Sequence, residues 1–129
     1  MTDLERVLCV EDEPDIRAVA ELALGAIGGL EVIVCASGEE ALQVAPVNAP
    51  QLILLDVLMP GMDGPETLSA LRRIPAVAAV PVVFMTARAD PDEQAAYRAL
   101  GAAGTIAKPF DPMTLAESVR AIWREQSTG

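Results

Sequence analysis

Residues 52–64 have the sequence LILLDVLMPGMDG, an apolar run that ends in an aspartate and is followed by a loop with two glycines. The run is a continuous block of Leu and Ile, without the alternation of apolar and polar residues found in half-exposed strands. Such blocks are typical of strands buried on both faces of a parallel sheet. Working outward, the chain has five short apolar runs in all: residues 7–10, 32–35, 52–55, 82–85 and 105–107.

The segments between these runs carry helical signals. Apolar residues from Ile16 to Ile27 recur at the spacing of one helical face, and Gly28 and Gly29 end that helix. The later segments begin with capping residues or with proline, which open helices. They predict helices over residues 38–44, 65–73 and 93–100, with Ser37 and Asp90 or Asp92 as caps, and a last helix opened by Asp111 and Pro112.

Strand and helix therefore alternate five times, with short connections. This alternation requires a parallel sheet with right-handed crossovers and helices on both faces. The sequence predicts an α/β fold, a doubly wound five-stranded parallel sheet with five helices. Because no repeat or linker divides the chain, we expect a single domain over residues 1–129 with no room for an effector domain.

Composition excludes several kinds of function. Nine basic and nineteen acidic side chains give a net charge of −10, which disfavours direct binding to nucleic acid or to anionic membranes. The chain has no histidine, which excludes Ser-His and Cys-His nucleophiles, HExxH zinc sites and a phosphohistidine carrier. The sequence has no signal peptide and no apolar run long enough to span a membrane. Cys9 and Cys35 lie inside apolar runs, which is typical of buried, reduced cysteines. We therefore expect a soluble, cytoplasmic protein.

Polar residues follow four of the five apolar runs directly. In open parallel sheets, the functional crevice lies at the carboxyl ends of the strands, so these side chains are expected to meet at one edge. They are Glu11, Asp12 and Glu13 after the first run, Asp56 after the third, Thr86 after the fourth and Lys108 after the fifth.

This set of side chains predicts phosphoryl chemistry. Asp12 and Asp56 would repel each other, and a hard divalent cation such as Mg²⁺ relieves that repulsion. Lys108 adds a positive charge and Thr86 a hydroxyl. A carboxylate, a magnesium ion, a lysine and a hydroxyl are the groups needed to accept a phosphoryl group. Because the chain has no GxxxxGK[ST] loop to hold a nucleotide, we expect the donor to be another molecule.

Four segments resemble, in the same order, those of response-regulator receiver domains, the phosphoacceptor half of two-component signalling. They are VLCVEDEPDIR at residues 7–17, LLDVLMPGMDG at 54–64, MTA at 85–87 and KPF at 108–110. The resemblance covers essentially the whole chain and extends to stand-alone regulators of the chemotaxis type. It implies the flavodoxin-like strand order 2-1-3-4-5.

The resemblance also implies the roles of individual residues. Asp56 would be the phosphoacceptor, with Thr86 and Lys108 contacting the phosphoryl group after transfer. The peptide bond between Lys108 and Pro109 is expected to be cis, as only bonds before proline commonly are. The implied ligands of magnesium are Asp12, Asp56, the backbone carbonyl of Leu58 and, through a water molecule, Glu11.

Three positions bear on the switch and on the lifetime of the phosphoryl group. Relatives couple the hydroxyl at the Thr86 position to an aromatic residue three positions before the lysine. Here that residue is Thr105, which has no ring to turn, so we expect either that backbone movement carries the signal or that the movement is small. Leu58 and Arg88 flank the implied path of attacking water. Leu58 cannot orient water and Arg88 can shield the phosphoryl oxygens, so we expect slow self-dephosphorylation.

The leading hypothesis is a signalling switch and not an enzyme. It would be phosphorylated by a sensor histidine kinase or a histidine phosphotransfer protein and would then change its affinity for an unknown protein target. Nucleic acid and membranes are not expected partners, while a homodimer, common among relatives, is left open. The alternatives are a phosphatase resembling the haloacid dehalogenases, although Asp56 lies in no DxD motif, and a pseudo-receiver that binds partners without phosphorylation.

Overall fold

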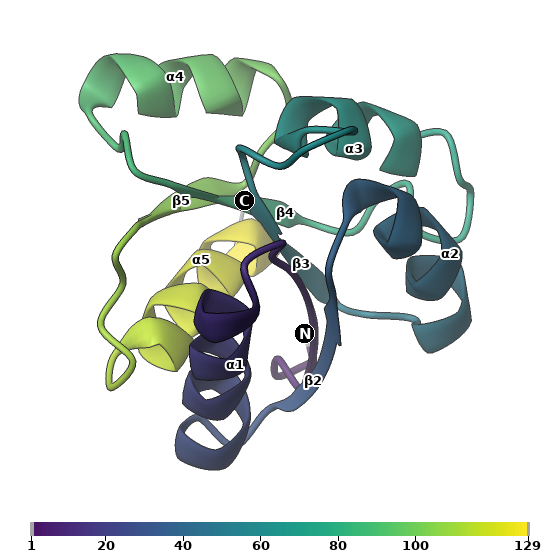
Figure 1. Cartoon of the computed structure of the whole chain (residues 1–129). Helices are drawn as coiled ribbons and strands as arrows, with labels where there is room; N and C mark the ends of the chain where they lie inside the picture. The colour runs from purple at the N-terminus through teal and green to yellow at the C-terminus, as the bar shows by residue number, and fades with distance from the viewer. Residues whose placement is uncertain (1, 129) are drawn as a thin grey trace.

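Strands and helices alternate along the chain (Figure 1). The computed structural model describes residues 2–128, so Met1 and Gly129 of the predicted domain lie outside the described residues. The strands are β1 Arg6–Val10, β2 Glu31–Cys35, β3 Leu52–Asp56, β4 Val82–Thr86 and β5 Gly104–Ala107. The helices are α1 Pro14–Leu22, continued by the π-helical turn η1 Ala23–Ile27, then α2 Gly38–Asn48, α3 Gly64–Leu71, α4 Pro91–Ala99 and α5 Leu115–Thr128.

All neighbouring strands pair in parallel, in the order β2-β1-β3-β4-β5. The predicted α/β class, strand number and strand order are confirmed. In this register, Cys9 pairs with Val34 and Val10 with Cys35. Since successive side chains of a strand point to opposite faces, the two cysteines lie on opposite faces of the sheet, and both thiols are free and buried.

Helices cover both faces of the sheet, as the continuous apolar runs of the strands require. Every residue of β3 and β4 is buried. On one face, Leu54 and Met85 pack with α1, η1 and α5; on the other, Leu55 and Phe84 pack with α2 and α3. Because side chains fill both faces, the ends of the strands are the places left for polar chemistry. Among the described residues, no helix is long and apolar enough to cross a bilayer.

The N-terminal half contains two departures from the predicted helices. The helix expected to continue to Ile27 changes to a π-helical turn after Leu22. The next helix, α2, was predicted over 38–44 but ends at Asn48. Its Pro46 lies in the last turn, and Ala49, with a φ of 48°, closes the helix by donating its N–H to Ala45.

The C-terminal helices begin at other residues than predicted. α4 starts at Pro91, and Asp90 lies at the N-cap position without a capping hydrogen bond from its side chain. α5 starts at Leu115 and not at Asp111 or Pro112. A carboxylate oxygen of Asp111 instead accepts a hydrogen bond of 2.9 Å from the N–H of Met113, which makes a separate turn before the helix.

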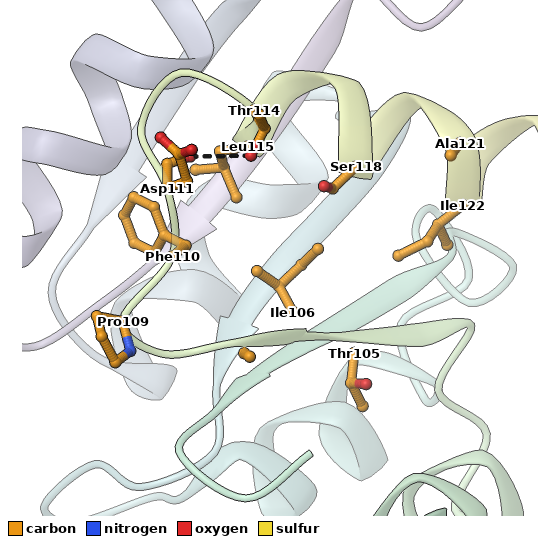
Figure 2. Close-up of a pocket in the computed structure, with 11 residues that line it drawn as sticks. Thr105, Ile106, Pro109, Phe110, Asp111, Thr114, Leu115, Ser118, Ala121 and Ile122 are labelled. Carbon is orange, nitrogen blue, oxygen red and sulfur yellow. Dashed lines mark hydrogen bonds between the residues drawn. The ribbon is translucent and has the colours of Figure 1, made fainter. Parts of the chain in front are cut away.

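A groove of about 480 Å³ runs between β5 and α5 (Figure 2). Ile106 of β5 and Ile122 of α5 lie on either side of it, and Thr105 contributes to its lining although its side chain points away from α5. The residues that line this groove include Thr105, the expected switch position. They include none of the residues expected to bind the phosphoryl group or the metal.

Gly64 allows the start of α3 to lie directly against the end of β3. A Cβ atom at this position would be 2.7 Å from the carbonyl oxygen of Asp56 and 2.8 Å from the Cα of Val57. Both neighbours are backbone atoms, so neither can turn aside.

We predict that Gly64→Ala lowers the free energy of unfolding by about 1–3 kcal/mol, because the backbone must shift to admit the methyl group. Gly25→Ala is the control, because its Cβ would meet nothing nearer than 3.8 Å, and it is expected to leave stability nearly unchanged. Urea titration measures both variants. Equal midpoints for Gly64→Ala and the wild-type protein would contradict the close approach.

Candidate functional site

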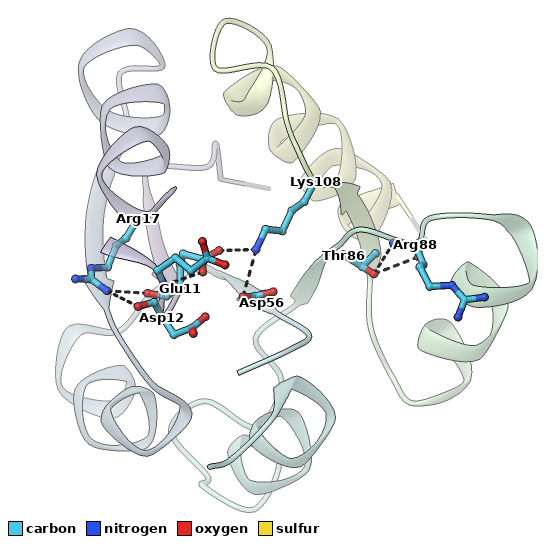
Figure 3. Close-up of polar contacts among 8 residues, drawn as sticks. Glu11, Asp12, Arg17, Asp56, Thr86, Arg88 and Lys108 are labelled. Atoms are coloured by element: carbon cyan, nitrogen blue, oxygen red, sulfur yellow. Dashed lines mark hydrogen bonds and ion pairs between the residues drawn. The ribbon is translucent and has the colours of Figure 1, made fainter. Parts of the chain in front are cut away.

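The polar residues at the strand ends gather at one edge of the sheet (Figure 3). Asp56 and Thr86 are the last residues of β3 and β4, and Lys108 directly follows β5. All three line a cavity of about 520 Å³. Glu11 and Asp12, directly after β1, complete the group from the neighbouring strand.

Lys108 links two carboxylates that come from different strands. Its ammonium donates a hydrogen bond of 2.9 Å to Glu11 and lies 3.3 Å from a carboxylate oxygen of Asp56 (Figure 3). Burial lowers the pKa of Lys108, but the hydrogen bond and charge of Glu11 and the charge of Asp56 outweigh burial, so the net pKa is raised. The lysine is therefore held in its charged form. The peptide bond between Lys108 and Pro109 is cis, as the resemblance implies.

Glu11 is fully buried, and both of its carboxylate oxygens have protein partners. One oxygen accepts from Lys108, and the other accepts a hydrogen bond of 3.0 Å from the N–H of Glu13. The guanidinium of Arg17 donates to the backbone carbonyls of Glu11 and Asp12, at 2.9 and 3.5 Å. These contacts fix the loop after β1. The role of Glu11 as a ligand through water stays a prediction.

The site carries more negative than positive charge. Ligand oxygens of Glu11, Asp12 and Asp56 all lie within 4.8 Å of one another, with the ammonium of Lys108 beside them. Burial and the charge of Glu11 raise the pKa of Asp56 from 3.8 to about 7, although Lys108 partly offsets them. A set of three carboxylates with an excess of charge suits a hard divalent cation such as Mg²⁺. The donor set therefore fits the predicted metal, while no contact tests the carbonyl of Leu58.

The hydroxyl of Thr86 is turned toward the loop between β4 and α4. It accepts a hydrogen bond of 3.0 Å from the N–H of Arg88 and donates one of 3.2 Å to its carbonyl. The guanidinium of Arg88 is largely exposed and lies 3.8 Å from Glu93. The contacts drawn in Figure 3 thus form two groups. One joins Arg17, Glu11, Asp12, Asp56 and Lys108, and the other joins Thr86 and Arg88.

Sequence reasoning missed two residues of the site. Arg17 holds the carbonyls of Glu11 and Asp12, and its only signal was its place early in the first helix. Tyr97 of α4 lines the same cavity as Asp56. Its helix consists mainly of alanine and polar residues, and nothing in the sequence indicated that Tyr97 packs against Phe84 of β4.

The fold and the acidic site with its lysine define a class, the receiver domains of response regulators. Residues 7–120 match the response regulator receiver domain family, and the chain belongs to that family. Receiver domains are signalling domains of two-component systems, and they generally bind Mg²⁺ at an acidic pocket.

Individual relatives fall in the same class. The transcriptional regulatory protein CseB of Streptomyces coelicolor is 37% identical over 124 residues, which are 96% of this chain and 51% of that protein. PrrA of Mycobacterium bovis, also a transcriptional regulatory protein, is 37% identical over 95% of this chain and 52% of its own length. The chemotaxis protein CheY4 of Vibrio cholerae has a TM-score of 0.84 and 33% identity, covering 92% of this chain and 98% of that one. The chain spans about half the length of the curated relatives it matches.

The raised pKa of Asp56 predicts how stability depends on pH without metal. Between about pH 4 and 7 the folded protein keeps a proton that the unfolded chain has lost, so stability falls as the pH rises through this range. Asp56→Asn removes this charge and leaves the pair of Glu11 and Lys108 intact. We expect it to raise the free energy of unfolding at pH 8 by about 1–3 kcal/mol.

The measurement is urea unfolding from pH 4 to 8 in the presence of a chelator. Asp92→Asn, on the exposed first turn of α4, is the control and should follow the wild-type curve. Parallel curves for Asp56→Asn and the wild-type protein would show that Asp56 keeps an ordinary pKa.

Proposed function

We propose that residues 1–129 form one receiver domain that acts as a phosphorylation switch, with Asp56 as the phosphoacceptor. The supporting observation is the buried Asp56 carboxylate, 3.3 Å from Lys108, in an open cavity at the edge of the sheet. The chain has no histidine, so a phosphohistidine donor would have to lie on another protein. We expect that protein to be a sensor kinase or a phosphotransfer protein. The family match favours this function over a haloacid-dehalogenase-like phosphatase.

In the transfer step, a carboxylate oxygen of Asp56 attacks phosphorus, and the bond from phosphorus to the donor's imidazole nitrogen breaks. The electron pair of that bond leaves with the imidazole, and Asp56 becomes an acyl phosphate. Lys108, already beside Asp56, offsets the negative charge of the phosphoryl oxygens. The hydroxyl of Thr86 turns from Arg88 and donates to a phosphoryl oxygen.

Magnesium would be held by Asp12, Asp56 and the carbonyl of Leu58, with Glu11 acting through water. When bound, the cation neutralises charge on the reacting oxygens. Without it, the three neighbouring carboxylates oppose the approach of a phosphoryl dianion.

We expect the switch to act in the cytoplasm and through protein partners. A net charge of −10 disfavours DNA as a ligand of this domain itself, although CseB and PrrA are transcriptional regulatory proteins. The proposed partners are the kinase or phosphotransfer protein and a downstream protein target, with a homodimer as one further arrangement.

Acetyl phosphate with Mg²⁺ tests the acceptor directly. Intact-mass measurement should show an adduct of about 80 Da on the wild-type protein, because one phosphoryl group is added. Asp56→Asn should show none, and Asp92→Asn, which changes an exposed residue outside the cavity lining, should show the wild-type adduct. Chelation of Mg²⁺ should suppress it. An inert wild-type protein at high acetyl phosphate would favour the pseudo-receiver instead.

The lifetime of the adduct tests Leu58 and Arg88. Leu58 lines the cavity with an exposed apolar side chain that cannot orient a water molecule, and Arg88 lines it with an exposed guanidinium. Leu58→Asn combined with Arg88→Ala should speed loss of the phosphoryl group about tenfold, because an amide can position water and the shield is removed. Decay is followed on phosphate-sensitive gels. An unchanged rate in the double variant would assign the lifetime to other residues.

A further inference from the structure

The loop between β1 and α1 carries two of the three carboxylates of the site. Only residues 11–13 separate the end of β1 from the start of α1. Glu13 lies at the N-cap of α1, and its side chain makes no capping hydrogen bond. The backbone of this short segment therefore determines where the carboxylates of Glu11 and Asp12 lie.

The two carboxylates are held in different ways. Glu11 accepts a hydrogen bond on each oxygen, one from Lys108 and one from the N–H of Glu13. Asp12 is only partly buried, and within the described part of the chain no hydrogen bond or ion pair holds its carboxylate. One of its oxygens nevertheless lies within 4.8 Å of ligand oxygens of Glu11 and Asp56. The position of the Asp12 carboxylate beside two other acids therefore depends on its own backbone.

Arg17 of α1 donates to all three backbone carbonyls of this loop. Its guanidinium donates at 2.9 Å to the carbonyl of Glu11 and, more weakly, at 3.5 Å to that of Asp12. Its own N–H donates at 2.9 Å to the carbonyl of Glu13. One residue thus fixes three consecutive peptide groups.

The guanidinium lies behind the loop and not in the site. In Figure 3, Arg17 is on one side of the loop, and Asp56 and Lys108 are on the other. The guanidinium bonds to main-chain oxygens, so its contacts leave the carboxylate of Asp12 free for a ligand.

Positioning and charge predict opposite effects of Arg17 on a bound cation. A guanidinium near the site repels a divalent cation, so the loss of its charge alone would strengthen cation binding. Loss of its hydrogen bonds to the loop would instead free the backbone of Asp12 and weaken cation binding. The sign of the change in affinity therefore separates the two effects.

We propose that Arg17 is a positioning residue for the divalent cation, an inference that rests on the proposed function. By holding the carbonyls of Glu11 and Asp12, it keeps the Asp12 carboxylate beside that of Asp56, where one cation can bind both. Arg17 is not itself a ligand, and it acts through the backbone of Asp12.

Titration with Mn²⁺, which takes the same oxygen ligands as Mg²⁺, measures the affinity directly. The electron paramagnetic resonance signal of the free ion falls as the ion binds, and Mg²⁺ should displace it. Arg17→Gln loses the charge and is too short to reach the carbonyls. It should bind Mn²⁺ about tenfold more weakly, a loss typical of residues that orient metal ligands. Arg73→Gln, which removes the same charge from an exposed position after α3, is the control and should bind like the wild-type protein.

Two further variants distinguish positioning from a general loss of structure, and urea unfolding with a chelator shows that each variant is folded. Arg17→Lys keeps the charge and can donate to the carbonyls, so it should restore most of the lost affinity. Asp12→Asn removes the ligand through which Arg17 acts. In that background, Arg17→Gln should weaken binding by less than about twofold, because the two substitutions disrupt the same interaction.

Phosphorylation by acetyl phosphate provides a second readout. Arg17→Gln should need about tenfold more Mg²⁺ for the half-maximal rate of adduct formation. At saturating Mg²⁺ its rate should stay within about twofold of the wild-type rate, because Asp56 and Lys108 are unchanged. A disturbed acceptor would lower the rate at saturation instead.

The outcomes separate the two proposals. Three results would each overturn the role of Arg17 and leave the acceptor role of Asp56 intact: Mn²⁺ binding by Arg17→Gln as tight as in the wild-type protein or tighter, equal losses with and without Asp12→Asn, or no recovery in Arg17→Lys. A wild-type protein that gains no adduct from acetyl phosphate and Mg²⁺ would overturn the proposed function itself.

Discussion

The ion pairs of Lys108 with Glu11 and Asp56 hold together the ends of three strands. Glu11 is fully buried and Asp56 nearly so, and a buried carboxylate without a partner is costly. One ammonium can offset part of the charge of three neighbouring carboxylates, and an excess of negative charge remains. This excess negative charge in the folded protein favours the binding of a cation. The same residual charge that costs stability would favour the proposed binding of a metal.

The sheet explains why this charge collects at one edge. β3 and β4 are buried along their whole length, so an ionised side chain inside either strand would face an apolar layer of helices. At the carboxyl end each strand leaves the layered core, and a polar residue there reaches the cavity while its backbone stays paired. Asp56 and Thr86 occupy this last paired position, joined to Met85 and Ala107 in the ladder.

Most of the fold could be predicted because the strands and the polar residues of the site are both marked by local patterns in the sequence. Continuous apolar blocks mark the strands within one residue at each end, and the polar residues after them mark the site. The misses have separate physical causes. The burial of Glu11 follows from Lys108, 97 positions away in the chain, and the late start of α5 follows from a turn that Asp111 closes with its own side chain. The exposure of α4 also left no signal, because periodicity indicates a helix but not how closely it packs.

That loose packing is what a switch of this size needs. Moving a two-state equilibrium from nearly all of one form to nearly all of the other takes about 5.5 kcal/mol of differential interaction. The proposed site, with one hydroxyl, one lysine and one metal, would supply only a few such contacts, so an element that it moved would have to be weakly held. α3, with Leu68 and Leu71 in the core, is too firmly anchored for this, since burying each leucine stabilises it by about 1.5–3 kcal/mol. α4 rests on one aromatic contact and on a loop that Thr86 holds by its hydroxyl. Under the proposed function, local differences in packing therefore determine how easily each part of the receiver would move.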